Sequence, residues 1–155
     1  DRGIPITTLQ VQYSLLSTYP VTELVIQEVC AELGIHLIAY SPLALGMLTG
    51  KYRIGETLPQ GLRGFVFRQI LPGAQPILDT LEAIAIFRDK TMSQVALNWC
   101  ICKGFIPIPG AKNLAQAQQN TGTLGWRLDG GEVLELDRAI DRSNKQMVQN
   151  IFQTR

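Results

Sequence analysis

Three short apolar segments alternate with helical patterns along this chain of 155 residues, and this alternation constrains the fold more than any other feature. The segment 9–16 (LQVQYSLL) alternates apolar and polar residues, whereas 35–40 (IHLIAY) is almost continuously apolar, as expected of a strand covered on both faces. Residues 105–109 (FIPIP) form the third segment. Strands separated by helices build a parallel sheet with right-handed crossovers. The sequence therefore predicts an α/β fold, either an open doubly wound sheet or part of a (β/α)8 barrel.

Capping residues and prolines set the expected helix boundaries. We expect a first helix over residues 22–34, with Thr22 as N-cap and an apolar face of Leu24, Val25, Val29 and Leu33. Pro76 opens a second helix over 77–89, and a third runs from Thr91 or Ser93 toward Gly104. A fourth covers 114–121, with Asn113 as N-cap and Gly122 as stop, and a fifth begins at the capping box Asp129-x-x-Glu132. Between Tyr40 and Pro76 the chain is rich in Gly and Pro, which predicts a long loop of the functional or disordered kind.

Charge and apolar patterning exclude several classes of protein. The 14 Lys and Arg residues against 13 Asp and Glu give a net charge of +1, so we expect no nucleic-acid partner. Because apolar runs stay well below the ~18 consecutive residues typical of a membrane span, we expect no membrane partner either. The three cysteines are an odd set without metal-ligand spacing, which indicates free thiols and no metal site.

The sequence also allows predictions about both ends of the chain. The first residues, 1–5 (DRGIP), include neither a start methionine nor a targeting segment, which indicates an internal start. Residues 144–155 form a polar tail that we expect to be mobile.

The choice between the two architectures favours the barrel. An open nucleotide-binding sheet normally carries G-x-G-x-x-G after its first strand, and this chain has no such run. Barrels often bind phosphate in the loops after their last two strands, at the N-terminus of a short helix. The loop 110–113, which leads into a capped helix, is of this form, because free N–H groups and the helix dipole attract anions.

Four motifs in order then resemble a known family. They are VQYSLL (11–16), IAYSPLALGMLTGKY (38–52), QVALNWC (94–100) and IPIPGAKNLAQAQQN (106–120). Together they resemble the C-terminal part of aldo-keto reductases, of the plant chloroplast-type branch, with potassium-channel β-subunits as more distant relatives. The resemblance implies the C-terminal part, about strands 6 to 8 with their helices, of a (β/α)8 TIM barrel that is incomplete as given, with residues 1–155 as a partial oxidoreductase domain.

The resemblance also implies a binding site for NADP(H). Gln10, at the end of the first strand, matches the glutamine that binds the nicotinamide carboxamide, and Tyr40 matches the aromatic residue that stacks on the nicotinamide ring. A flat aromatic side chain at the mouth of a barrel strand suits that role. Ser41 and Leu43 match positions that contact the pyrophosphate and ribose.

The remaining matched positions concern the phosphates and the adenine. Lys51 matches a lysine near the phosphates and Arg63 an arginine beside the adenosine 2′-phosphate, both expected in a Gly-rich lid loop. Four further matches to 2′-phosphate and adenine contacts are Lys112, Gln116, Gln119 and Asn120. The last three are spaced i, i+3 and i+4, which places them on one helical face.

Departures from the family pattern limit what the resemblance implies. Leu9 stands where an asparagine is usual, Gln119 replaces a common glutamate, and the Asp, Tyr, Lys and His of the catalytic tetrad belong to strands that precede this segment. We therefore expect no catalytic residue here. The parent protein is expected to reduce a small aldehyde or ketone with NADPH, in the chloroplast by resemblance and otherwise in the cytoplasm. The alternatives are a non-catalytic NADP(H)-sensing module and an inactive truncated product, which could self-associate through exposed barrel edges.

Overall fold

A parallel sheet of three strands forms the centre of the computed structural model, which describes residues 3–22, 25–55, 57–144 and 147. The strands are β1 (Thr8–Gln12), β2 (His36–Tyr40) and β3 (Phe105–Pro107), in the order β1-β2-β3. Both pairings are parallel, so the carboxyl ends of all three strands lie at one edge. The predicted α/β fold with a parallel sheet is confirmed.

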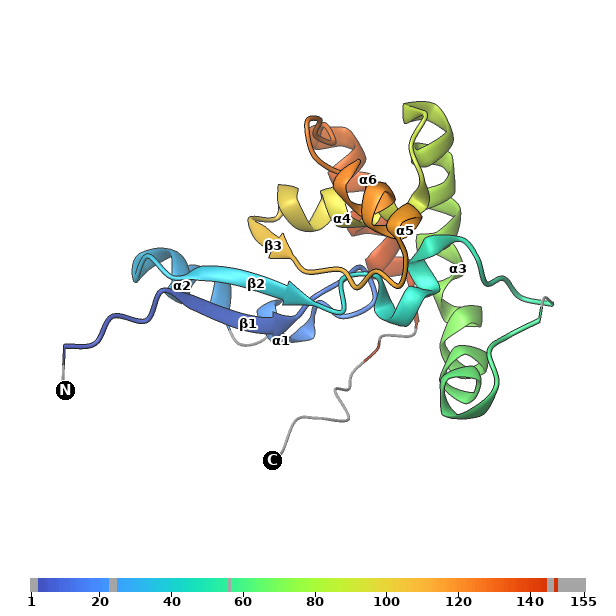
Figure 1. The fold of residues 1–155 in the computed structure, drawn as a ribbon, viewed down its shortest axis with the longest axis horizontal. Coiled ribbons are helices and arrows are strands. Elements are labelled where there is room, and N and C mark those ends of the chain that lie inside the picture. The colour runs from blue at the N-terminus through green and yellow to red at the C-terminus, as the bar shows by residue number, and fades with distance from the viewer. Residues whose placement is uncertain (1–2, 23–24, 56, 145–146, 148–155) are drawn as a thin grey trace.

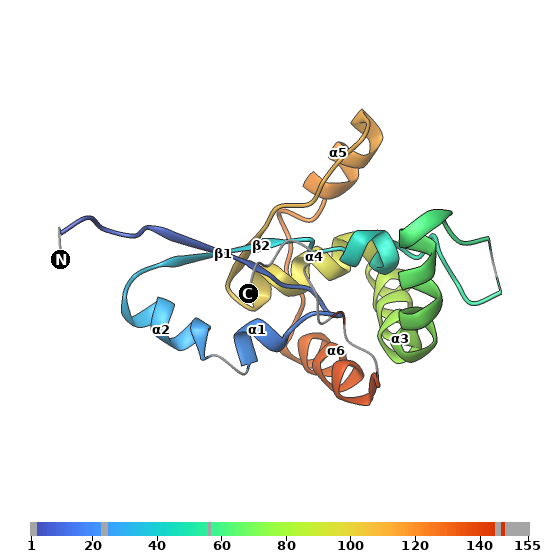
Figure 2. The same ribbon diagram turned by 90° about the horizontal axis from the view of Figure 1, so that it is seen from below.

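Helices make every connection. The link from β1 to β2 contains α1 (Tyr19–Thr22) and α2 (Ile26–Glu32), and the link from β2 to β3 contains the 3-10 segment η1 (Ala44–Thr49), α3 (Gly61–Arg88) and α4 (Met92–Cys102). After β3 come α5 (Leu114–Thr121) and α6 (Gly130–Arg142). Figure 1 shows β1 and β2 at one side of the molecule, with α3, α4 and α6 gathered at the other. Figure 2 shows α1, α2 and α6 on one side of the sheet, while α5 reaches out on the opposite side.

The long helix α3 overturns the predicted loop between residues 41 and 76. It begins at Gly61 rather than after Pro76, and both Pro72 and Pro76 lie inside it. An interior proline costs a helix about 3 kcal/mol. Buried apolar residues at alternating spacings of four and three offset that cost, namely Phe67, Leu71, Ala74, Leu78, Leu81 and Ala85. This stripe packs against α4 and α6. Burial of apolar residues against these two helices therefore determines where α3 begins.

By length and hydropathy alone, α3 could cross a membrane. Its buried stripe contacts α4 and α6, however, as expected of a helix in the core of a folded domain. Its exposed positions carry charged residues such as Arg68 and Asp79 as well as large apolar residues such as Phe65 and Phe87.

The predicted caps of the later helices are confirmed. Thr91 and Gln94 form a capping box at the start of α4, and Asn113 accepts a hydrogen bond from the backbone N–H of Gln116 at the start of α5. Asp129 and Glu132 form the capping box of α6. Local hydrogen bonding between neighbours in sequence fixes each of these boundaries, which is why the sequence predicts them.

The first predicted helix differs in extent and orientation. Thr22 belongs to α1, and Val25, in the left-handed region with φ 50°, precedes α2. Of the apolar face expected to be inside, Leu24 lies outside the described residues, while Val25, Val29 and Leu33 are 52%, 49% and 67% exposed. The helix instead turns Ile26 and Cys30 toward the core, because these form a second apolar pair at i, i+4.

Aromatic rings join the sheet to the helices. The predicted strand through residue 16 ends at Gln12, and the Tyr13 ring beyond it stacks between Trp99 of α4 and Phe105 of β3, with centroids 5.1 and 3.9 Å away. The Trp99 indole also donates a hydrogen bond of 2.9 Å to Asp137 of α6. This stack therefore links β1, β3, α4 and α6 in one core.

The polar tail is only partly described. Most of residues 144–155 lie outside the described residues, so the expected mobility is not tested there. Met147 is an exception, since it is buried and its N–H donates to the Leu16 carbonyl at 2.6 Å. At this residue the tail contacts the body of the chain, and the predicted mobility of residues 144–155 stays a prediction.

Candidate functional site

The carboxyl edge of the sheet brings the chain segments around Tyr40 together. The N–H of Tyr13 donates to the Tyr40 carbonyl at 3.3 Å, and the N–H of Ile108 donates to the Ala39 carbonyl at 3.0 Å. Tyr40 therefore lies at the end of the middle strand, between the ends of its two neighbours. Its side chain is half-buried, and burial raises the pKa of its phenol, so the ring is neutral at physiological pH.

The loop after Tyr40 has an unusual backbone. Ser41, Ala44 and Leu45 all have positive φ values, of 52°, 49° and 56°, although none is glycine. Non-glycine residues in the left-handed region cost of order 1–3 kcal/mol each and cluster at functional sites. The hydroxyl of Thr49 donates to the Gly46 carbonyl at 2.8 Å and helps to fix the loop. Of the two candidate ligands in this loop, Ser41 itself has a strained backbone, whereas Leu43, with φ −102°, directly precedes the strained pair Ala44 and Leu45.

Arg63 reaches this loop from the first turn of α3, so its predicted place in a lid loop is wrong. Its guanidinium lies over the rings of Tyr52 and Phe67, with Cζ 5.4 and 5.2 Å from the centroids, and its Nη2 donates to the Leu45 carbonyl. Its Nε is buried and has no hydrogen-bond partner among the residues that the structure describes. A buried donor without a partner is costly, so this atom is suited to an incoming acceptor.

Lys51 adds a second cation to the same place. Its ammonium lies 5.5 Å from the centroid of the Tyr52 ring, and its side chain is exposed. Among the described residues, neither Lys51 nor Arg63 pairs with a carboxylate. Two positive charges without a carboxylate partner among the described residues mark this corner as suited to an anion.

Arg53, close in sequence, shows the contrasting arrangement. It forms a bidentate pair with Glu82 of α3, at 3.0 and 2.5 Å, and the hydrogen bonds from Arg53 lower the pKa of that carboxyl. This pair fastens the chain after Tyr52 to the middle of α3. The charge of Arg53 is therefore compensated by Glu82. Within the described ranges, Lys51 and Arg63 have no such acidic partner.

The other candidate ligands lie on and before α5. Lys112 is exposed, and its N–H donates to the Gln116 amide oxygen at 2.7 Å. Asn120 donates to the Gly110 carbonyl at 3.3 Å, and Gln94 of α4 donates to the Gln119 carbonyl at 3.0 Å. The amides of Gln116 and Asn120 thus stabilise the loop before α5, which the sequence did not predict.

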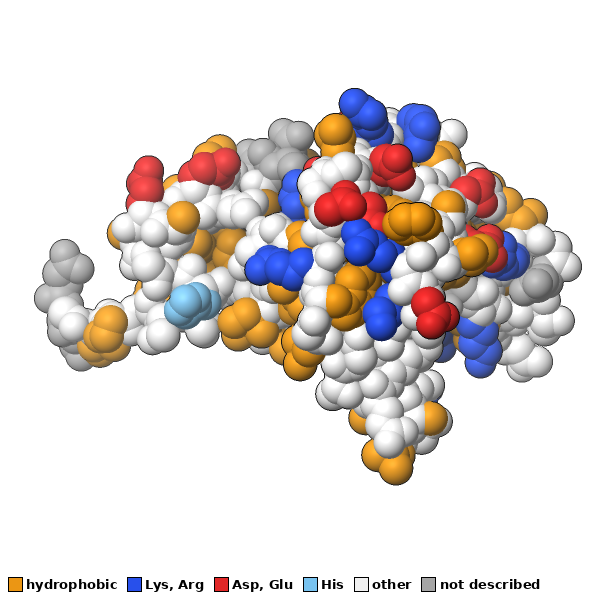
Figure 3. All heavy atoms as spheres, turned by 90° about the horizontal axis from the view of Figure 1, so that it is seen from above, with side chains coloured by type: hydrophobic (Ala, Val, Ile, Leu, Met, Phe, Trp, Pro, Cys, Tyr) orange, Lys and Arg blue, Asp and Glu red, His pale blue; other side chains and the backbone are white. Residues whose placement is uncertain are grey.

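The structure separates the candidates into two groups and one isolated residue. Tyr40, Ser41, Leu43, Lys51 and Arg63 form the first group, around the loop that follows β2. The α5 group projects from the body, and Figure 3 shows hydrophobic side chains at the tip of that projection. Among the described residues, we find no hydrogen bond or ion pair that joins the two groups. Gln10 is exposed within β1, opposite Ile38, rather than at the strand end that the sequence predicted.

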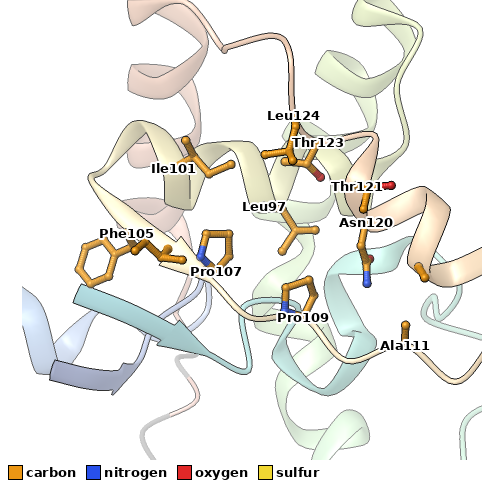
Figure 4. A pocket seen from close by; sticks show the side chains of 12 residues that line it. Leu97, Ile101, Phe105, Pro107, Pro109, Ala111, Asn120, Thr121, Thr123 and Leu124 are labelled. Carbon is orange, nitrogen blue, oxygen red and sulfur yellow. The ribbon is translucent and has the colours of Figure 1, made fainter. Parts of the chain in front are cut away.

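A cavity of about 560 Å³ lies between α4, β3 and α5 (Figure 4). Its walls are mainly apolar and include Leu97, Ile101, Pro107 and Leu124. Of the candidate ligands, only Asn120 lines it. Because a charged nucleotide needs polar partners that these walls do not supply, the cation group near Tyr52 is the better candidate site.

Two residues that support the site escaped the sequence reasoning. Asn98 is fully buried in α4, where its amide nitrogen donates to the carbonyls of Thr123 and Trp126 at 3.0 Å each and its oxygen accepts from the Leu128 N–H at 2.9 Å. It therefore fixes the chain that leaves α5. Tyr52 is the ring beneath both cations. No periodicity distinguishes either residue from its neighbours.

Comparison with known proteins identifies the family. The model of the aldo/keto reductase family matches residues 1–141. The chain belongs to the aldo/keto reductase family. The resemblance that its motifs carried is thereby confirmed, and the three parallel strands are part of the family's (β/α)8 barrel.

Relatives of this aldo/keto reductase chain are longer than the chain itself. It is similar to the chloroplastic pyridoxal reductase of Arabidopsis thaliana, at 56% identity over 154 residues, which are 99% of this chain and 42% of that protein. It is also similar to the Schizosaccharomyces pombe aldo-keto reductase yakc [NADP(+)], at 30% identity over 90% of this chain and 43% of that protein. The chain thus spans less than half the length of these two relatives.

Solved structures share the fold. Glycerol dehydrogenase AKR11B4 from Gluconobacter oxydans superimposes with a TM-score of 0.80 at 24% identity, over 97% of this chain and 47% of that one. An aldo/keto reductase from Klebsiella pneumoniae, in complex with NADP and acetate, gives a TM-score of 0.61 at 26% identity, over 96% of this chain and 44% of that one.

Proposed function

We propose that this chain is the cofactor-holding part of an NADP(H)-dependent reductase of small carbonyl compounds. The observation that carries the proposal is a pair of cations, Lys51 and Arg63, that have no carboxylate partner among the described residues. They lie beside the strained loop that follows Tyr40 at the carboxyl edge of the sheet. The buried Nε of Arg63, which lacks a partner, is a donor suited to a phosphate oxygen. NADPH, when bound, would supply the hydride.

Each candidate residue then has a role toward the cofactor. Tyr40 stacks on the nicotinamide, Gln10 binds its carboxamide, and Ser41 and Leu43 contact the pyrophosphate and ribose. The phosphate and adenine contacts come from Lys51, Arg63, Lys112, Gln116, Gln119 and Asn120. For the α5 group, this requires that the Gln116 and Asn120 amides exchange their loop contacts for the ligand or continue to support the loop from behind.

Likeness to relatives supports a proposal for the substrate of the whole protein. The likeness to a pyridoxal reductase at 56% identity supports an aromatic aldehyde of the pyridoxal class, and a chloroplast location by the same resemblance. We infer that residues 1–155 belong to one oxidoreductase domain and that the tetrad residues which donate the proton lie outside them. The second candidate function is an NADP(H) sensor without turnover, for which the same candidate residues would bind the cofactor.

Self-association is part of the proposal for the chain as given. Within the described residues, β1 and β3 each have one neighbour in the sheet, which leaves their outer edges open to another chain. Exposed apolar residues flank both edges, including Ile6 at 69% and Ile106 at 51%. Such edges favour pairing with further strands, whether from the rest of a barrel or from a second copy.

Replacing Arg63 by methionine is expected to weaken NADPH binding by roughly 10- to 100-fold, the cost of a hydrogen bond to a charged group. NADH lacks the 2′-phosphate, so its affinity should change several-fold less. Lys51→Met should weaken both cofactors, because it acts on phosphates that the two share. Titration followed by nicotinamide fluorescence measures each affinity.

The matched control is Arg68→Met, which removes an exposed cation from the same helix. It should leave both affinities within about twofold. The proposal is contradicted if Arg68→Met and Arg63→Met lower the affinity for NADPH equally, since the effect would then come from net charge alone.

A further inference from the structure

Tyr52 lies beneath the two cations of the proposed phosphate site. The Lys51 ammonium is 5.5 Å and the Arg63 Cζ 5.4 Å from the centroid of its ring. We propose that Tyr52 is a positioning residue for phosphate recognition: its ring holds both Lys51 and Arg63 close to itself before the anion binds. This inference rests on the proposed function and deepens it, because it names a residue that prepares the site for a phosphate-bearing dinucleotide.

The physical need for such a ring comes from repulsion between like charges. Without an anion, electrostatic repulsion favours separation of the Lys51 and Arg63 side chains into solvent. Each binding event would then have to restrict both side chains again, at a cost in conformational entropy. The negative face of an aromatic ring attracts a cation, so one ring shared by two cations opposes their separation. The site is thereby organised in advance of its ligand.

Tyr52 is itself fixed from the core. Its ring meets that of Phe67 edge to face, at 5.1 Å between centroids and 80° between planes. Phe67 is fully buried in the apolar stripe of α3. Phe67 therefore connects the core to Tyr52, whose ring contacts the cations of the proposed phosphate site. Arg63 lies over both rings.

Other rings with a cation over them differ from Tyr52. Arg88 lies over Phe87 and Lys103 over Trp99, but Arg88 pairs with Glu132 and Lys103 with Asp137. Lys90 lies over Trp126 as a single cation. Within the described part of the chain, Tyr52 is the one ring that holds two cations without a carboxylate partner.

The test compares Tyr52→Leu, which removes the ring, with Tyr52→Phe, which keeps it. In the full chain, Tyr52→Leu is expected to weaken NADPH binding by about 5- to 20-fold, as expected for two weakened cation–ring contacts, and to flatten the dependence of affinity on salt. Tyr52→Phe should bind NADPH within about twofold of the original chain, since its ring face is retained. A role in folding alone would lower the melting temperature without changing the salt dependence.

Proton NMR of the Lys51 side chain tests the arrangement without any cofactor. Ring currents should shift its Cε protons upfield in the original chain and in Tyr52→Phe, and this shift should vanish in Tyr52→Leu. Absence of the shift in the original chain, or equal NADPH affinity in Tyr52→Leu and Tyr52→Phe, would overturn the inference. If the shift is present while the original chain does not bind NADPH, the cofactor assignment fails and the ring–cation arrangement stands.

Discussion

Replacing Asn98 by leucine is expected to lower the free energy of unfolding by about 3–5 kcal/mol, because three buried backbone groups lose their partners at roughly 1–3 kcal/mol each. Those groups are the carbonyls of Thr123 and Trp126 and the N–H of Leu128. Leucine has a similar volume, so the loss comes from hydrogen bonding rather than from a cavity. The same bonds fix the chain after α5, so the variant should also loosen that helix.

Urea unfolding followed by circular dichroism measures this loss as a lower midpoint at an unchanged slope. Asn98→Asp is the informative partner variant, since a carboxylate still accepts from Leu128 but faces two carbonyl oxygens without a donor. It should be at least as destabilising as the leucine variant. The exposed Asn144→Leu serves as control and should change stability by less than about 0.5 kcal/mol. A loss below about 1 kcal/mol for Asn98→Leu would contradict the account of this residue.

Replacing Trp99 by alanine is expected to cost about 3–5 kcal/mol, the range for removal of a buried aromatic side chain. Trp99 is 1% exposed, stacks on Tyr13 and donates to Asp137, so its loss breaks the contact between the sheet and α6. Since domains are stable by only about 5–15 kcal/mol, this single change should bring the chain close to unfolding at room temperature.

Trp99→Phe separates the ring from the hydrogen bond. Phenylalanine keeps much of the stacking surface and loses the donor to Asp137, which predicts a cost of about 1–2 kcal/mol, well below that of alanine. Chemical denaturation of both variants, followed by far-ultraviolet circular dichroism, gives the comparison. Equal costs for the two variants would show that the hydrogen bond, and not ring packing, carries the contribution of Trp99.

The fold illustrates which features a single sequence determines. The capping boxes at Thr91 and Asp129 and the cap at Asn113 depend on residues three apart, and the structure has all three. The start of α3 depends on burial against α4 and α6, which are distant in sequence, so prolines and glycines between 61 and 76 suggested a loop instead. The spacing of Phe67, Leu71 and Ala74 carried the helical signal, and only packing shows that it overrides the prolines.

The candidate site shows the same division. Motif likeness named Tyr40, Lys51 and Arg63, and their roles toward a cofactor stay predictions. Spacing could not show that Arg63 approaches from a helix, or that Tyr52 lies beneath both cations, because these contacts join residues through the tertiary fold. Gln10 likewise could be placed on a strand from sequence, but its distance along that strand from the carboxyl edge depends on register with β2.

The most direct test of the central claim is a thermal melt of this chain alone, with NADPH and with NADH at equal concentration. A ligand that binds only the folded state raises its melting temperature, by about 2.7 kcal/mol of stability at one hundred times the dissociation constant. For a chain of this size, that corresponds to roughly 5–10 °C. We expect one cooperative transition, raised by NADPH more than by NADH. A cooperative transition that neither cofactor shifts, or that both shift equally, would contradict a preformed site selective for the 2′-phosphate.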